Sequence, residues 1–281
     1  GWLWDWGLLL AMWGKNTKKE KDKRKMGWEI KGDIMISYIG GKYRQAKWIS
    51  SFIPNNVENY IEVFGGAMWV YINGNHNNYD NVTYNDVNTF MANLFSCCTL
   101  YKDFVPLLEE IDPQERFIFD MYKEEILQRF EDGDIELYDL DLARKYVYVA
   151  TQVFSGIINK KSKMVDLKGK YKSKYLSFLD RLKKKEIQKK LEKLVVTNKS
   201  YDKVIPEVDS ENTLMYLDPP YYGTENLYDF HSFTKEHHEH LINLLKGSKS
   251  KWILSYYEFD LLRDWFPKDI WHWEEKDYKK A

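Results

Sequence analysis

Short apolar runs alternate with longer amphipathic stretches along most of the chain. Their β-branched and aromatic residues predict buried strands at residues 59–64, 82–87, 212–217 and 250–257. Residues 234–247 carry Leu241, Leu244 and Leu245 at helical spacing, and Gly247 is a plausible helix end. Strands that alternate with helices predict an α/β fold, with a mostly parallel sheet that helices cover on both faces.

The alternation is lost between residues 101 and 195, where the chain is helical, charged and aromatic. Within this stretch, residues 159–190 hold thirteen Lys or Arg and three acidic residues. Such a run is typical of a solvated helix face or of a surface that contacts phosphates, and composition leaves both open. We therefore expect an extension at residues 1–32, an α/β domain at 33–100 and 196–281, and an inserted helical domain at 101–195.

The N-terminal extension opens with an apolar stretch of about a dozen residues, which is too short to span a bilayer. Basic residues follow the apolar stretch, which reverses the charge order of a signal peptide. We expect a tail or small helix that packs on the body, followed by a solvated charged linker. A helix lying on a membrane surface stays open as an alternative.

Composition, net charge and cysteine content say more about the cellular environment of the protein than about its reaction. The 281 residues are 44% hydrophobic and have a formal net charge of −1, so any attraction to nucleic acid must be local. The two cysteines, Cys97 and Cys98, are adjacent and have the spacing of neither a zinc site nor a disulfide framework. This usage favours a reducing, cytoplasmic setting. Separately, we expect neither a membrane partner nor an obligate protein partner.

Candidate chemistry lies where the predicted strands end, because ligands of open α/β sheets bind beyond the carboxyl ends of the strands. Asp218 follows the third strand, and the two prolines after it can neither extend a strand nor enter a helix. The result is a rigid corner with a carboxylate and open carbonyls, or else an ordinary aromatic turn. Asp86, at the end of the second strand, could accept the hydroxyls of a ribose or cap the next helix.

Four stretches in chain order together resemble the Dam-type (alpha-class) adenine-N6 DNA methyltransferases. They are YIGGKYRQAKWI (38–49), IEVFGGAMWV (61–70), YNDVN (84–88) and LDPPYYG (217–223). The resemblance implies a Rossmann-like methyltransferase sheet with an inserted helical target-recognition domain. It also implies methyl transfer from S-adenosylmethionine, without a metal, to an adenine flipped out of double-stranded DNA. The expected setting is the cytoplasm of a prokaryotic or phage-infected cell.

The same resemblance assigns roles to single residues. Asp218 and the carbonyl of Pro219 would accept hydrogen bonds from the adenine amine, Pro220 would fix the corner, and the ring of Tyr221 would stack on the base. Phe233 would either enclose the base or belong to the core. The residues expected to line the cofactor site are Tyr38, Gly40, Lys42, Glu62, Phe64, Gly65, Gly66, Asp86 and Asp218.

The basic run would then position the duplex by contacting phosphates. The residues expected to do so are Lys160, Lys161, Lys163, Lys170, Lys172, Lys174, Lys183 and Lys184. Two alternatives stay open: an RNA adenine-N6 methyltransferase, for which tyrosines of the insert could stack on bases, and a catalytically silent DNA-binding relative. His237, His238 and His240 are clustered, but they lack the i, i+4 pair of a zinc-binding helix.

Overall fold

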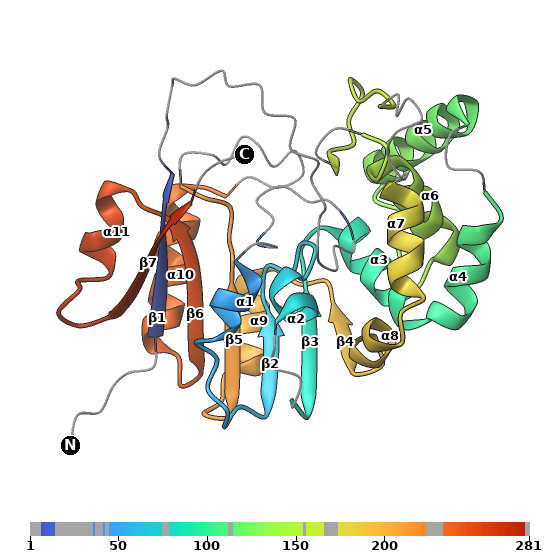
Figure 1. Cartoon of the computed structure of the whole chain (residues 1–281). Helices are drawn as coiled ribbons and strands as arrows, with labels where there is room; N and C mark the ends of the chain where they lie inside the picture. Colours follow the sequence, from blue (N-terminus) through green and yellow to red (C-terminus); the bar gives the residue numbers. More distant parts are fainter. Residues whose placement is uncertain are drawn as a thin grey trace, which may run out of the picture. The chain divides into compact units, whose positions relative to one another are not determined.

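The protein folds into two compact units in a computed structural model (Figure 1). The model describes residues 7–14, 36, 42, 45–74, 79–111, 115–153, 156–165, 174–222 and 233–278. The strand-rich unit consists of Gly1–Lys31, Asn56–Phe64 and Ser200–Ala281, and the helix-rich unit of Gly32–Asn55 and Gly65–Lys199. This division follows spatial contacts, and the domain boundaries expected from the sequence stay predictions.

The strand-rich unit contains a five-stranded sheet with the order β2-β5-β6-β1-β7. Its strands are β1 (Gly7–Gly14), β2 (Asn59–Glu62), β5 (Thr213–Leu217), β6 (Lys251–Tyr257) and β7 (His272–Tyr278). Every neighbouring pair in this order is parallel. Its helices are α9 (Tyr201–Val208), α10 (Lys235–Gly247) and α11 (Asp260–Trp265). The sequence-based prediction of a mostly parallel, Rossmann-like α/β fold is confirmed.

Alternating residues of the sheet build the core of this unit, as period-2 patterning requires. The sheet residues in this core are Ile61, Val63, Met215, Leu217, Trp252, Leu254 and Tyr256. Helix α9 contributes Tyr201, Val204 and Ile205, and α11 contributes Leu262. Helix α10 buries His238, Leu241, Ile242 and Leu245, an i, i+3, i+4, i+7 stripe that turns one face of the helix inward.

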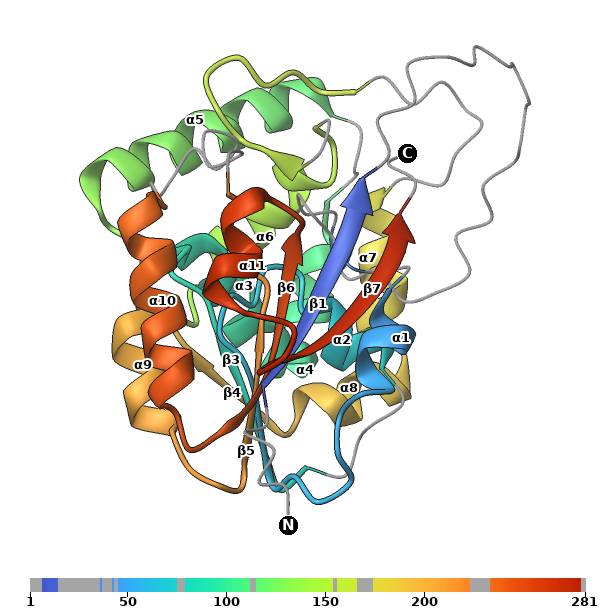
Figure 2. The same cartoon turned by 90° about the vertical axis from the view of Figure 1, so that its left-hand side faces the viewer.

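The N-terminal apolar stretch is an inner strand of this sheet. Gly7–Gly14 form β1, which pairs with β6 on one side and β7 on the other (Figure 2). The expectation of a tail or small helix is therefore wrong for these residues. A short continuous apolar run fits a buried strand and a buried helix equally well, and pairing with two neighbouring strands decides the outcome.

The helix-rich unit holds a parallel pair of strands, β3 (Asn81–Asn85) and β4 (Leu194–Thr197). Its helices are α1 (Ala46–Ser50), α2 (Trp69–Asn73), α3 (Thr89–Thr99), α4 (Tyr101–Glu109), α5 (Arg116–Asp132), α6 (Leu140–Ala150), α7 (Lys174–Leu182) and α8 (Lys185–Leu191). Strand β4 lies at the end of the stretch expected to be helical. No helix in the described part of the chain is long and apolar enough to cross a membrane.

Candidate active site

The Asp218 corner follows a fully buried strand. All five residues of β5 are buried, and Asp218, the next residue, is partly exposed. Pro219 and Pro220 end the strand there because neither can donate a ladder hydrogen bond. The hydroxyl of Tyr221 donates to Oδ1 of Asp218 at 2.8 Å. The carboxylate of Asp218 is thus held by a residue of its own corner.

The ring of Tyr221 packs into the protein. Tyr221 is 5% exposed, and its ring centroid lies 4.3 Å from that of Tyr257. The sequence resemblance implied that this ring stacks on the target base, and that role stays a prediction. What the structure adds is a second role for the same side chain, since its hydroxyl orients Asp218.

Residues at the end of β2 lie in the same unit. Glu62 is 2% exposed and accepts a hydrogen bond from the hydroxyl of Tyr60 at 3.0 Å. Phe64 is partly buried, with its ring stacked on Tyr201 at 5.9 Å and edge-on to Phe233 at 5.8 Å. Phe64 therefore belongs to an aromatic cluster, and Phe233, left open between two roles by the sequence, is one of its members.

The glycine turn lies in the helix-rich unit. The N–H of Gly65 donates to the carbonyl of Asn85 at 2.7 Å, and the hydroxyl of Tyr84 donates to the carbonyl of Gly66 at 2.9 Å. A Cβ atom at Gly65 would lie 2.7 Å from Cζ of Tyr84, so only glycine fits beneath this ring. Gly66 itself has a φ of 47°, in the left-handed region that glycine adopts without strain.

Asp86 is joined to the glycine turn. Its Oδ2 accepts the N–H of Gly66 at 2.7 Å, and its Oδ1 accepts the N–H of Asn88 at 2.8 Å. Burial raises the pKa of Asp86 to about 6, although both backbone hydrogen bonds act to lower it. A buried carboxylate with a strongly raised pKa is a candidate for a binding role.

The competing interpretation of Asp86 as a helix cap fails. The side chain of Asn88 is the N-cap of α3, accepting the N–H groups of Phe90 and Met91. Within the described part of the chain each oxygen of Asp86 accepts one hydrogen bond, which leaves a second lone pair that can accept a hydroxyl. Asp86 is therefore positioned by the turn and keeps acceptor capacity for a ligand.

Three other residues expected at the cofactor site are less informative. Lys42 is described and is 3% exposed. Tyr38 and Gly40 lie outside the described residues. Met68, in the same turn as Gly65 and Gly66, has a left-handed φ of 53° and is the N-cap residue of α2. That conformation is unfavourable for a side chain with a Cβ and identifies this turn as locally strained.

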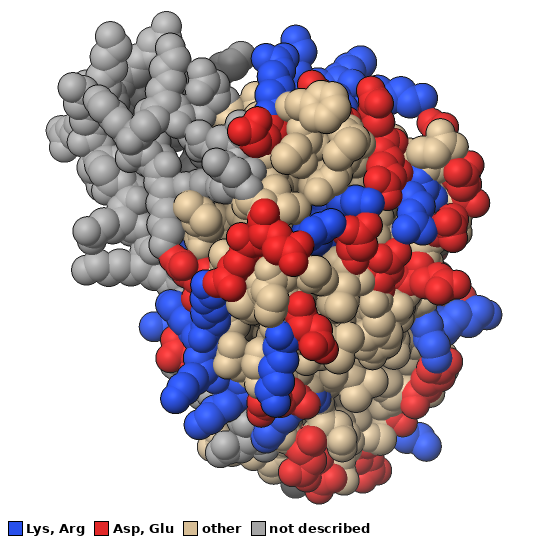
Figure 3. All heavy atoms as spheres, turned by 90° about the vertical axis from the view of Figure 1, so that its right-hand side faces the viewer, with Lys and Arg blue, Asp and Glu red and all other residues tan. Residues whose placement is uncertain are grey.

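Most of the basic residues predicted to contact phosphates are exposed. The exposed ones are Lys160, Lys161, Lys163, Lys174, Lys183 and Lys184, while Lys170 and Lys172 lie outside the described residues. Lys160 pairs with Glu131 at 3.0 Å, and Lys183 pairs with Glu109. On the face shown in Figure 3, basic and acidic side chains are interspersed. The contact with phosphates stays a prediction.

Two aromatic residues of the basic run, Tyr175 and Phe178, are not stacking platforms, and the third, Tyr171, lies outside the described residues. Tyr175 and Phe178 of α7 are each 1% exposed, and the hydroxyl of Tyr175 donates to the carbonyl of Leu108 at 2.7 Å. These rings anchor α7 to the helix-rich unit. They therefore give no support to single-stranded RNA recognition by stacking.

The three clustered histidines have separate structural roles. His237 belongs to the capping box of α10, His238 is fully buried beside Tyr256, and His240 lies 3.2 Å from the hydroxyl of Tyr201. The described residues contain no group of His, Cys, Asp or Glu arranged to hold a metal ion. His238 and Tyr256, behind the Asp218 corner, were missed by the sequence reasoning. The sequence signal that could have found His238 was its spacing from Leu241 and Leu245, which places it in the buried stripe of α10.

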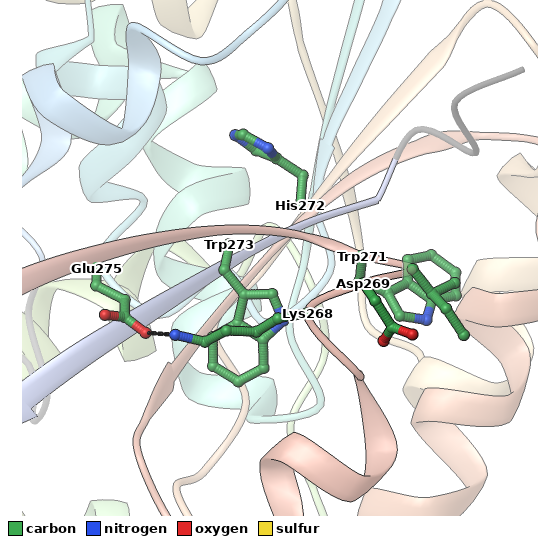
Figure 4. Close-up of a pocket in the computed structure, with 7 residues that line it drawn as sticks. Lys268, Asp269, Trp271, His272, Trp273 and Glu275 are labelled. Carbon is green, nitrogen blue, oxygen red and sulfur yellow. Dashed lines mark hydrogen bonds and ion pairs between the residues drawn. The ribbon is translucent and has the colours of Figure 1, made fainter. Parts of the chain in front are cut away.

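An open pocket of about 470 Å³ is lined by the segment that connects α11 to β7 and by β7 itself (Figure 4). Its lining residues are Lys268, Asp269, Ile270, Trp271, His272, Trp273 and Glu275. Lys268 pairs with Glu275 and lies 5.2 Å above the ring of Trp273. None of the residues expected to be catalytic or to bind the cofactor lines this pocket.

Comparison with known proteins identifies the family of the chain. A family profile described as D12 class N6 adenine-specific DNA methyltransferase matches residues 38–280. The chain is also 25% identical, over 253 residues, to the type II methyltransferase M.CviBI of Paramecium bursaria Chlorella virus NC1A. That alignment covers 87% of this chain and 90% of the viral protein. The family expected from the four motifs is confirmed, and the chain belongs to the D12 class N6 adenine-specific DNA methyltransferases.

Proposed function

We propose that the protein is a site-specific methyltransferase that moves a methyl group from S-adenosylmethionine to N6 of an adenine flipped out of double-stranded DNA. The observation that carries the proposal is the Asp218 corner, in a chain whose family methylates adenine in DNA. Its similarity to a type II methyltransferase supports action at a defined DNA sequence. We also propose that it works in the cytoplasm of a prokaryotic or phage-infected cell.

The residues present fit the cofactor. Asp86 is a buried carboxylate whose pKa is raised to about 6, and a ligand that donates hydroxyl hydrogens would stabilise its charged form. Asp86 would hold the ribose hydroxyls, and the turn at Phe64, Gly65 and Gly66 would lie beneath the methionine part. When bound, S-adenosylmethionine supplies a methyl group on a positively charged sulfur.

Asp218 would make the adenine amine reactive. The lone pair of that nitrogen is delocalised into the ring, so the amine is a poor nucleophile. The Asp218 carboxylate and the carbonyl of Pro219 would accept hydrogen bonds from its two N–H groups, which returns electron density to nitrogen. Because the prolines fix the corner and Tyr221 holds Oδ1, these acceptors are oriented before the reaction.

The exposed lysines of the helix-rich unit would contact the phosphates of the duplex. The exposed candidates are Lys160, Lys161, Lys163, Lys174, Lys183 and Lys184, of which Lys160 and Lys183 would exchange an acidic partner for a phosphate. These contacts would position the DNA without reading its sequence. Flipping the base costs a few kcal/mol, which contacts within the pocket would offset.

The RNA and silent-relative alternatives are not favoured. The matching family acts on DNA, and the rings of Tyr175 and Phe178 are buried. The residues of the D-P-P-Y motif that a silent relative would lose, Asp218 foremost, are present.

The test is a transfer assay with labelled S-adenosylmethionine and three matched substrates: duplex DNA, single-stranded DNA and RNA of the same sequence. We expect label in N6-methyl-2′-deoxyadenosine from the duplex, confined to one short sequence. Label mainly in RNA, or spread over all adenines, would contradict the proposal. The Asp218→Ala variant controls for contaminating activity.

A further inference from the structure

His238 occupies a position where the helical pattern calls for an apolar residue. It shares the inward stripe of α10 with Leu241, Ile242 and Leu245, and it is fully buried, at 0% exposed. Burying an imidazole is unfavourable unless hydrogen bonds replace the lost water. Here the hydrogen bond joins Nδ1 of His238 to the hydroxyl of Tyr256 on β6, at 2.6 Å.

The imidazole also contacts two aromatic residues that adjoin the proposed site. The ring of Tyr222 lies 5.5 Å away at 67°, and the ring of Phe233 lies 4.7 Å away at 84°. Tyr222 directly follows Tyr221, and Phe233 packs edge-on against Phe64. His238 therefore packs against Tyr222, which follows the Asp218 corner, and against Phe233, which packs on Phe64 before the glycine turn.

A second path leads from His238 to the same corner. Tyr256, held by the imidazole, has its ring 6.4 Å from that of Tyr221. The hydroxyl of Tyr221 in turn donates to Oδ1 of Asp218 at 2.8 Å. Tyr221 thus packs against Tyr256, which His238 holds, and Tyr222 packs against His238 itself.

We propose that His238 is a positioning residue for methyl transfer. Through Tyr222 and Tyr256 it fixes Tyr221, so that the hydroxyl of Tyr221 keeps the Asp218 carboxylate oriented toward the adenine amine. The inference rests on the proposed role of Asp218. In this role His238 affects the rate of methyl transfer through Tyr222, Tyr256 and Tyr221, and it contacts neither the cofactor nor the DNA.

The experiment compares two removals of the same hydrogen bond. His238→Phe and Tyr256→Phe each keep a ring and remove one partner. With saturating cofactor and duplex DNA, we expect each variant to lose about 10- to 100-fold in kcat, since small misplacements of reacting groups cost this much. The double variant should lose no more than the worse single variant, because both act on one hydrogen bond. The Kd for S-adenosylmethionine should stay within about twofold.

A matched control separates positioning from stability. Trp252 of β6 donates through Nε1 to the carbonyl of Leu245 on α10 at 3.0 Å, so Trp252→Phe removes another hydrogen bond between the same two elements. We expect this variant to lower Tm and to keep the wild-type kcat. His238→Asn, whose amide can replace Nδ1, should recover part of the kcat that His238→Phe loses.

Two results would overturn the inference. One is a wild-type kcat in both His238→Phe and Tyr256→Phe. The other is an equal loss of kcat in Trp252→Phe, which would show a general effect of stability. The proposed role of Asp218 fails separately, through an active Asp218→Ala variant.

Discussion

Two aspartates each directly follow a strand, and the structure surrounds them differently. Asp86 follows β3, is 7% exposed, and accepts two backbone N–H groups. Asp218 follows β5, is partly exposed, and accepts a side-chain hydroxyl from Tyr221. Backbone donors fix a carboxylate rigidly, which suits the binding of a cofactor that is the same in every reaction cycle. A side-chain donor at a more open corner suits an acceptor that meets a large substrate.

The difference predicts a division of labour. Loss of Asp86 should affect cofactor binding and the pH dependence of stability, and loss of Asp218 should affect the transfer step. Each variant below tests one side of this comparison.

The largest expected effect is on the transfer step. Asp218→Ala should lower kcat at least about 1000-fold, because it removes a preorganised acceptor at the reacting amine. Single-turnover methyl transfer to duplex DNA measures this. Asp264→Ala, an exposed aspartate of α11, is the control and should keep wild-type activity. Near-normal turnover by Asp218→Ala would refute its proposed role.

Asp86 should make stability depend on pH. Its pKa in the folded protein is raised from 3.8 to about 6, so its contribution to stability is fully present below about pH 4 and lost as the pH rises through about 6. The loss is on the order of 3 kcal/mol. The free energy of unfolding of Asp86→Asn, relative to wild type, should therefore rise by about this amount between pH 4 and pH 8. Urea titrations at both pH values measure it, and a constant difference would contradict it.

Asp86→Asn should also weaken cofactor binding. The variant loses the charge and one of two acceptor oxygens, so we expect about 100-fold weaker binding of S-adenosylmethionine at pH 8. In the wild type, affinity should fall about tenfold from pH 7 to pH 5 as Asp86 takes up a proton. Calorimetry at both pH values measures this. An affinity independent of pH would argue against Asp86 as the ribose acceptor.

The glycine turn that holds Asp86 should tolerate no side chain. Gly65→Ala places a Cβ against the ring of Tyr84 and should lower the free energy of unfolding by about 1–3 kcal/mol. Gly247→Ala, whose Cβ would meet no atom within 4 Å, is the matched control and should be neutral or slightly stabilising. Equal effects at both glycines would show that the contact with Tyr84 is unimportant.

The smallest expected effect separates two roles of one residue. Tyr221→Phe keeps the ring and removes the hydroxyl that donates to Asp218, and should lower kcat about tenfold. Tyr221→Ala, which also removes the ring, should lose more. An unchanged kcat in Tyr221→Phe would leave stacking as the role of this side chain.

The Asp218 corner and the glycine turn were predictable from the sequence because the local backbone chemistry of proline and glycine determines them. Pro219 and Pro220 must end a strand, and Gly65 and Gly66 allow a close turn. The burial of Asp86 and its hydrogen bonds to Gly66 and Asn88 were not predictable, since they depend on how the turn folds back.

Other elements depended on contacts between distant parts of the chain. The place of Gly7–Gly14 inside the sheet requires its pairing with β6 and β7. The four residues of β4 follow a charged helical stretch and became a strand by pairing with β3. The place of His238 in the helical stripe could indicate burial, but its contacts with Tyr222, Phe233 and Tyr256 were not predictable from the sequence.

The most direct test of the division of labour compares Asp86→Asn and Asp218→Ala under identical conditions. For each variant, calorimetry gives the Kd for S-adenosylmethionine, and single-turnover transfer at saturating cofactor gives the rate on duplex DNA. We predict that Asp218→Ala keeps the wild-type Kd and loses transfer. Asp86→Asn should lose affinity and recover most of the transfer rate at saturating cofactor. Equal losses of affinity in both variants would contradict the account.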